Sequence, residues 1–210
     1  MKFESRKSAG IALSDKLSRL SLEDPVILAL PRGGIPVGYE IAKKLNAPLD
    51  ILVVRKLGAP LQKEFAIGAI AEGDIKVLDE DSIGKLNITR EQLGKIILQE
   101  KQELERRIKI YRGDKTMLNV INKDVILVDD GVATGITSLA AIKFLKAHFP
   151  KQIILATPVC SKEAFLLLYA SLDKFICLIV PTRFRAVGSW YRSFGQLSDT
   201  EVVNLLNSTR

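Results

Sequence analysis

The stretch Val125–Thr137, VILVDDGVATGIT, decides the fold class of this chain. It opens with a short apolar, β-branched run, passes through two adjacent acidic residues and a loop of small residues, and ends where a helix can begin. An apolar run that is continuous rather than alternating is typical of a strand covered on both faces of its sheet. The stretch therefore predicts a buried strand, a tight loop and a helix, the repeating unit of a parallel α/β sheet.

The same order of strand and helix recurs along the chain. The apolar runs that we predict as strands are Val26–Leu30, Leu49–Val54, Val125–Val128, Ile153–Thr157 and Phe175–Val180. Amphipathic stretches of helix length lie between most of them, at Ile35–Leu45, Ile136–His148 and Ser161–Leu172. This alternation predicts an α/β fold in which helices flank a parallel sheet.

One segment departs from the alternation. Thr89 and Gln92 have the spacing of a capping box, and the charged stretch that follows ends at Gly113, so we predict one long helix over Thr89–Arg112. It is either a solvated surface helix or, over residues 85–115, a lid or an arm that packs on a second subunit. The second interpretation, an arm that packs on another subunit, favours a homodimer.

Composition bounds the organisation of the chain. With 210 residues of which 47% are hydrophobic, we predict a single domain over residues 1–210, with turn-rich loops at Leu57–Gln62 and Asp79–Asn87. The longest apolar runs have the length of strands, far short of the roughly 20 residues that cross a bilayer. The first ten residues, MKFESRKSAG, carry charges where an export signal needs an apolar run, so we expect a cytoplasmic protein without a membrane partner.

Several kinds of chemistry are disfavoured by scarce residue types. The chain has two cysteines, Cys160 and Cys177, and one histidine, His148. This argues against a zinc site, a disulfide framework and nucleophile schemes that need a histidine. The formal charge of +7 favours an anionic partner: nucleic acid, an acidic membrane surface or a highly phosphorylated small molecule. No dense Lys/Arg run with interleaved aromatic residues is present, which argues against nucleic acid.

The loop after the acidic pair has the residue types of an anion site. Small residues at Gly131, Ala133 and Gly135 let backbone N–H groups converge on a phosphate at the positive end of the following helix. Thr134 and Thr137 add hydroxyl donors. The ionised carboxylates of Asp129 and Asp130 only accept hydrogen bonds, so they suit sugar hydroxyls or water on Mg²⁺. The loop thus separates a phosphate end from a hydroxyl end.

This stretch resembles the phosphoribosyl pyrophosphate signature of the type I phosphoribosyltransferases: apolar strand, two acids, two variable positions, small residue, Thr, Gly, any residue, Thr. Gly131 departs from the pattern, which usually has an aliphatic residue there. The resemblance runs in order from about Phe3 to Leu206 and implies a type I phosphoribosyltransferase-like sheet with a small hood. It implies a binding segment for phosphoribosyl pyrophosphate made of Asp129, Asp130, Gly131, Val132, Ala133, Thr134, Gly135, Ile136 and Thr137.

The resemblance also implies roles for two other basic positions. In VILALPRGG, a strand enters a glycine-containing loop, and the family places pyrophosphate against the corresponding loop, here Arg32, Gly33 and Gly34. Arginine suits phosphate oxygens because its guanidinium is a planar fork of donors. After the second predicted strand come Arg55 and Lys56, similar to the basic pair of the adenine and orotate enzymes. We therefore expect Arg32, Arg55, Lys56, Asp129 and Asp130 to be the catalytic residues.

Beyond the last predicted strand lies the segment that the family uses as a hood over the acceptor. In this segment, residues 181–200, Phe184, Trp190 and Tyr191 have rings that can stack on a flat heterocycle. The lysine with which 6-oxopurine enzymes read their base is replaced by TPVCS, so the resemblance does not imply a purine acceptor. Aromatic residues that seal the edge of the sheet are the other interpretation.

The reaction that the resemblance implies is displacement of pyrophosphate from C1 of the ribose by a nitrogen nucleophile, with Mg²⁺ as cofactor. Ala133 stands where the 6-oxopurine enzymes carry a proton-accepting carboxylate, so no general base is assigned. Two other functions stay open: a non-catalytic nucleotide-sensing regulator or RNA-binding protein on the same fold, and an enzyme that splits a phosphoribosyl compound with water or phosphate.

Overall fold

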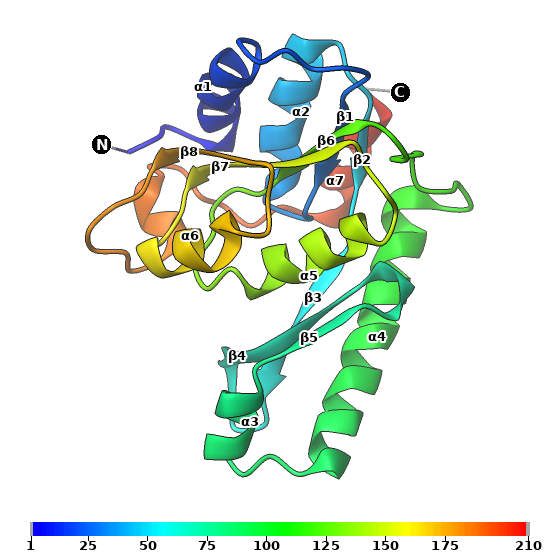
Figure 1. The fold of residues 1–210 in the computed structure, drawn as a ribbon, viewed down its shortest axis with the longest axis vertical. Coiled ribbons are helices and arrows are strands. Elements are labelled where there is room, and N and C mark those ends of the chain that lie inside the picture. The colour runs from blue at the N-terminus through cyan, green and yellow to red at the C-terminus, as the bar shows by residue number, and fades with distance from the viewer. Residues whose placement is uncertain (1, 209–210) are drawn as a thin grey trace.

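A five-stranded parallel sheet forms the centre of the computed structural model, which describes residues 2–208. The strands lie in the order β2-β1-β6-β7-β8 (Figure 1). Their bounds are Val26–Ala29 for β1, Leu49–Ile51 for β2, Asp124–Val128 for β6, Gln152–Val159 for β7 and Lys174–Ile179 for β8. Since every neighbouring pair is parallel, the carboxyl ends of all five strands meet at one edge.

Helices cover both faces of this sheet. One face is covered by α1 (Arg6–Leu17), α2 (Gly34–Leu45) and α7 (Asp199–Asn207), and the other by α5 (Ile136–Lys146) and α6 (Lys162–Tyr169) (Figure 1). Successive strand residues point to opposite faces: Ile126 and Val128 pack with α2, whereas Val125 and Leu127 pack with α5. The predicted fold, a parallel α/β sheet flanked by helices, is confirmed.

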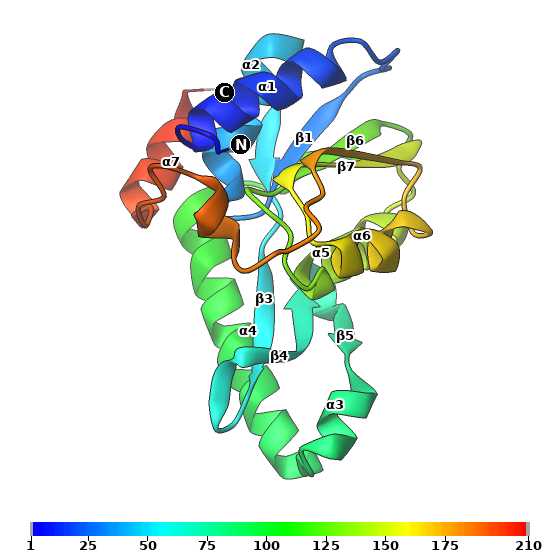
Figure 2. The same cartoon turned by 90° about the vertical axis from the view of Figure 1, so that its left-hand side faces the viewer.

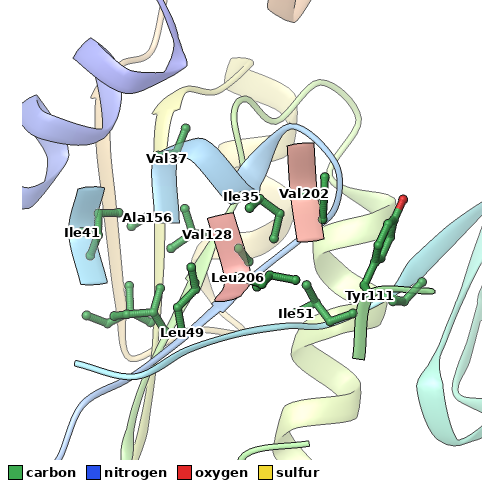
Figure 3. Packing of buried hydrophobic residues seen from close by; sticks show 14 of the residues in the cluster. Ile35, Val37, Ile41, Leu49, Ile51, Tyr111, Val128, Ala156, Val202 and Leu206 are labelled. Atoms are coloured by element: carbon green, nitrogen blue, oxygen red, sulfur yellow. The ribbon is translucent and has the colours of Figure 1, made fainter. Parts of the chain in front are cut away.

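The core beneath α2 is formed by aliphatic side chains from the sheet and from both ends of the chain. Figure 3 shows residues of α2, the sheet, α4 and α7 meeting there: Ile35, Val37, Ile41, Leu49, Ile51, Tyr111, Val128, Ala156, Val202 and Leu206. All ten are buried. The C-terminal helix is therefore part of the core, and it lies close to the loops that leave the sheet.

A second, antiparallel sheet projects from this body. It contains β3 (Val54–Ala59), β4 (Gln62–Ala71) and β5 (Lys76–Leu78), followed by the short helix α3 (Glu80–Lys85). The long helix α4 (Arg90–Arg112) runs alongside it and returns the chain to the body (Figure 2). Thr89 and Gln92 form the predicted capping box. We call β3, β4, β5, α3 and α4 the arm. That the arm acts as a lid or contacts a second subunit stays a prediction, and so does the single domain over residues 1–210.

Three sequence-based predictions about this region were wrong or incomplete, and two helices near the termini were not predicted. Leu49–Val54 is not one strand, since β2 ends at Ile51 and β3 begins at Val54 in the other sheet. The predicted loop at Leu57–Gln62 is a tight β3–β4 hairpin, and the one at Asp79–Asn87 contains α3. Helices α1 and α7 were not predicted, because the first has almost no apolar periodicity and the second is short.

A buried charge cluster joins the arm to the body. Arg112, at the end of α4, donates to the Glu72 carboxylate at 2.6 and 3.1 Å and to the carbonyl oxygen of Ile51 at 2.7 Å. Its Nε lies 3.5 Å from Asp50 Oδ2. Glu72 also accepts from the N–H of Val53. The cluster therefore fixes the point where the chain leaves the parallel sheet for the arm.

We expect Glu72→Ala to lower the free energy of unfolding by about 3–5 kcal/mol, because it leaves the Arg112 guanidinium buried without its main partner. Urea denaturation measures this change. Glu91→Ala is the control: it breaks the exposed Lys95–Glu91 pair of α4 and should change stability little. Equal effects of the two substitutions would contradict the buried cluster as the joint between arm and body.

Among residues 2–208 the structure contains no helix that combines the length and the apolar character needed to span a membrane.

Candidate functional site

The direction of winding reverses at the carboxyl edge of the parallel sheet, between β1 and β6. β1 and β6 are neighbours, but the chain leaves β1 into α2 on one face and leaves β6 into α5 on the other. Parallel α/β sheets bind their ligands at a reversal of this kind. The loops at this point are Pro31–Gly33 and Asp129–Gly135. The structure thus brings together the two loops that carry most of the predicted site residues.

The loop after β6 presents a row of backbone donors. Among the described residues, the N–H groups from Ala133 to Ser138 have no hydrogen-bond acceptor. Ala133 and Thr134 are exposed, and Gly135 turns the chain into α5 with a φ of +80°, a conformation that glycine adopts without strain. Converging free N–H groups at a helix N-terminus form an anion site.

Contacts with the neighbouring strand hold this loop in shape. The N–H of Val132 donates to the Val159 carbonyl oxygen at 2.9 Å. Ser161 donates from its backbone N–H to the Val132 carbonyl oxygen at 2.9 Å and from its hydroxyl to the Ala133 carbonyl oxygen at 2.6 Å. The N–H of Val132 is therefore paired with β7 and is not among the free donors of the loop. Sequence reasoning predicted Ser161 only as a helix start, and no local signal marked it as an anchor of the loop.

The two acidic residues lie side by side at the end of β6. The N–H of Asp130 donates to Asp129 Oδ1 at 2.8 Å. Burial, followed by the charge of Asp130, raises the pKa of Asp129 well above its ordinary value. Burial also raises the pKa of Asp130, although its hydrogen bond and attraction to Arg6 oppose this effect. Ionising these carboxylates in the ligand-free protein therefore costs free energy, and a bound cation or bound hydroxyl donors would offset that cost.

Arg6, from the start of α1, is the cation that pairs with these acids. Its Nε lies 2.7 Å from Asp130 Oδ2, and the two side chains are only 12% and 13% exposed. Arg6 was not among the residues predicted for the site. The only local signal is that Arg6 and Lys7 occupy the first turn of a helix that has no acidic residue there, where positive charge is unfavourable.

The loop after β1 packs directly against the acidic pair. A Cβ at Gly33 would lie 2.0 Å from Asp130 Oδ2, and one at Gly34 would lie 2.6 Å from the Val128 carbonyl oxygen. Both positions therefore require glycine. Arg32 follows a cis peptide bond with Pro31, and its guanidinium donates to the Leu197 carbonyl oxygen at 2.6 Å. It also lies 3.9 Å from Asp199 Oδ1 at the start of α7.

Arg55 and Lys56 occupy a different element from the one predicted. They do not follow a strand of the parallel sheet at its edge but lie inside β3 of the arm. Arg55 pairs with Glu100 of α4 at 2.6 Å, and Lys56 with Glu64 of β4 at 3.1 Å. The sequence could not show this because the apolar run continues through Leu52 and Val53, where the chain changes sheets. A role for the two cations in the reaction stays a prediction.

Of the three residues predicted to stack on the acceptor, Tyr191 does not have the exposed ring that this role needs. It is buried, its ring packs between Phe3 and Phe194, and its hydroxyl donates to the Asp130 carbonyl oxygen. It therefore supports the site and has no open face for an acceptor ring. Phe184 and Trp190 are half-buried, and their contact with an acceptor stays a prediction.

Residues 4–176 match the family described as "Phosphoribosyl transferase domain". This chain belongs to that family. Two Mycobacterium tuberculosis proteins, from strains CDC 1551 / Oshkosh and ATCC 25618 / H37Rv, carry provisional names as phosphoribosyl transferases. Each is 40% identical to this chain over 205 residues, or 98% of the chain and 46% of the relative. The phosphoribosyl transferase chain thus spans about half the length of the curated relatives that it matches.

Two solved structures show the same fold over the whole chain. The TT1426 protein of Thermus thermophilus is 38% identical, with a TM-score of 0.83 and 99% of each chain covered. A hypothetical protein of Neisseria gonorrhoeae, solved with bound ppGpp, is 13% identical, with a TM-score of 0.51 over 100% of this chain and 99% of its own. At that identity the second likeness concerns the fold alone.

Among the described residues, no three His, Cys, Asp or Glu side chains gather as a ligand set for a metal ion. The adjacent carboxylates of Asp129 and Asp130 are suitable outer partners for a hydrated divalent cation.

We expect Asp129→Asn to raise the free energy of unfolding of the ligand-free protein by on the order of 1 kcal/mol at about pH 7.5, because it removes a buried charge and keeps the acceptor for the Asp130 N–H. Since the pKa of Asp129 is raised in the folded state, the gain should be absent below its unfolded value of about 3.9 and grow as pH rises toward the folded value. Urea denaturation across this pH range measures it.

Asp79→Asn is the matched control, because hydrogen bonds from Ser82 lower the pKa of Asp79. Ionised Asp79 stabilises the fold above its unfolded pKa, so this substitution should give no gain at neutral pH. A loss of stability in Asp129→Asn at neutral pH would contradict the cost that we assign to the buried charge.

Proposed function

We propose that this phosphoribosyl transferase uses phosphoribosyl pyrophosphate and Mg²⁺ to transfer the phosphoribosyl group to a nitrogenous acceptor with release of pyrophosphate. The observation that carries the proposal is the row of free N–H groups from Ala133 to Ser138 beside two carboxylates. A sugar phosphate has the matching chemistry, since its phosphate accepts and its hydroxyls donate. The family match supports the same reaction class.

Within the proposal, each part of the ligand has its own binding residues. The 5-phosphate binds the loop from Gly131 to Thr137, where Thr134 and Thr137 add hydroxyl donors. The ribose hydroxyls donate to Asp129 and Asp130. The pyrophosphate binds Arg32, Gly33 and Gly34, and the direct packing of the Pro31–Gly33 loop against Asp130 supports this assignment.

Mg²⁺ fits this arrangement because Asp129 and Asp130 place two carboxylates side by side, and the positive charge of Arg6 offsets their negative charge only in part. The ion would be held mainly by the oxygens of the ligand, with Asp129 and Asp130 acting through water. When bound, it would neutralise charge on the departing pyrophosphate.

Within the proposal, the chain contributes binding and orientation more than covalent chemistry. The phosphate loop and the acidic pair fix the ribose between them, so that C1 faces the acceptor. Arg32 stabilises negative charge that develops on the pyrophosphate as the bond to C1 breaks. Ala133 has no proton-accepting group, and so we assign no general base.

The acceptor belongs in the hood region. The segment between β8 and α7 crosses near the phosphate loop, since a Cβ at Gly131 would lie 2.4 Å from Val187 (Figure 2). Phe184 and Trp190 lie in this segment and can contact a flat heterocycle. We further propose a cytoplasmic homodimer in which the arm meets the second subunit.

We expect titration calorimetry to show binding of phosphoribosyl pyrophosphate that requires Mg²⁺ and that weakens at least tenfold in Asp129→Asn/Asp130→Asn, because each substitution removes the negative charge and one of the two acceptor oxygens. Thermal melting controls for folding. Absence of binding by the folded wild type would overturn the proposal. Binding without pyrophosphate release for any nitrogenous acceptor would favour a non-catalytic sensor on the same fold.

We expect Arg32→Met to weaken binding of phosphoribosyl pyrophosphate by about tenfold while binding of ribose 5-phosphate changes little, because only the first ligand carries the pyrophosphate. Competition titration with both ligands measures the difference. Lys56→Met tests another predicted cation in the same way, and Lys95→Met, at an exposed pair near the start of α4, is the control. Equal weakening for both ligands would contradict a pyrophosphate site at Arg32.

A further inference from the structure

We propose that Arg6 is a positioning residue for the ribose site: it holds the Asp130 carboxylate in its binding orientation and ties the hood to the first helix. This inference rests on the proposed function. Arg6 reaches the site from a segment 124 positions away in sequence. Neither the phosphoribosyl pyrophosphate signature nor the loop after β1 includes it.

Three contacts fix the Arg6 guanidinium. Its Nε donates to Asp130 Oδ2 at 2.7 Å, and one terminal nitrogen donates to the Gly195 carbonyl oxygen at 2.9 Å. The guanidinium carbon lies 3.8 Å from the centroid of the Phe194 ring, in cation–π geometry. A side chain held by three contacts has little rotational freedom, and it therefore restricts the orientation of the carboxylate that it binds.

The location of Arg6 is unfavourable for the helix that carries it. Arg6 is the first residue of α1, after the Ser5 cap, and Lys7 follows it. Positive charge at a helix N-terminus opposes the helix dipole. The attraction to Asp130 offsets this unfavourable interaction with the helix dipole. It arises only because Arg6 and Asp130 meet in the tertiary structure. Arg6 is therefore explained by the acidic pair and not by the stability of α1.

The hood is joined to the same point. Tyr191 donates its hydroxyl to the Asp130 carbonyl oxygen, and its ring stacks on Phe194 with centroids 5.0 Å apart. The N–H of Phe3 donates to the Trp190 carbonyl oxygen at 2.8 Å. Both the backbone and the carboxylate of Asp130 are thus held by the two terminal segments of the chain, which close over the acidic pair from one side.

This arrangement has a consequence for ligand selectivity. Arg6 acts on the carboxylate that faces the ribose, and its polar contacts within residues 2–208 go to Asp130 and Gly195, not to the phosphate loop or Arg32. Its loss should impair recognition of the ribose while recognition of pyrophosphate alone is retained. A purely structural role would impair both equally.

The experiment compares Arg6→Met, which removes the charge, with Arg6→Lys, which keeps it. We expect Arg6→Met to weaken Mg²⁺-dependent binding of phosphoribosyl pyrophosphate at least tenfold and binding of pyrophosphate less than twofold, and Arg6→Lys to restore part of the loss. The matched control is Arg192→Met. Arg192 pairs with Glu4 at 2.9 Å across the same two segments, but both side chains are about two-thirds exposed and the pair lies outside the Arg6–Asp130 contact, so both affinities should stay as in the wild type.

A double-mutant cycle with Asp130→Asn separates positioning from support of the fold. We expect Arg6→Met to lose its effect on phosphoribosyl pyrophosphate affinity in the Asp130→Asn background, and its loss of Tm to be smaller there, because no buried carboxylate is left unpaired. Additive losses in affinity and Tm, or equal weakening for both ligands, would overturn the inference.

If the wild type binds pyrophosphate but not phosphoribosyl pyrophosphate, the proposed function fails and the ribose part of this inference with it. The Tm cycle then decides separately whether Arg6 fixes Asp130: a smaller loss in the Asp130→Asn background supports that contact, and additive losses overturn it.

Discussion

The close approach of the Pro31–Gly33 loop to Asp130 is the constraint on which the candidate site depends. A single added methyl group at Gly33 would overlap the Asp130 carboxylate, and one at Gly34 would overlap the backbone at the end of β6. The two loops can meet in this way because β1 and β6 are adjacent while their helices lie on opposite faces of the sheet. The strand order thus sets the distance between the proposed pyrophosphate and ribose ends of the site.

Two clusters among the described residues each combine one arginine with two carboxylates, and they differ in how the carboxylates are paired. In the cluster of Arg112, Glu72 and Asp50, Arg112 contacts both carboxylates, and backbone N–H groups donate to them as well, so the cluster holds the joint between body and arm. At the candidate site Arg6 contacts Asp130, and burial raises the pKa of both Asp129 and Asp130. Acids perturbed in this way are candidates for a ligand-binding site.

Local sequence was sufficient for most strands of the parallel sheet, for α4 and for the backbone donors of the loop after β6. The buried strands have continuous apolar runs, Thr89 and Gln92 cap α4 through neighbours in sequence, and the donors from Ala133 to Thr137 are backbone groups of one short segment. Each of these features depends on interactions within a few residues, and so pattern and spacing predict it.

Tertiary structure alone decided the partners of the charged and aromatic residues. The run Leu49–Val54 gives no sign that the chain changes sheets after Ile51, and Arg55 and Lys56 were misplaced for that reason. Arg6 meets Asp130, and the Tyr191 ring is buried against Phe3, because segments far apart in the sequence pack together. Such contacts arise from packing between distant segments, which leaves no periodicity or spacing in the local sequence.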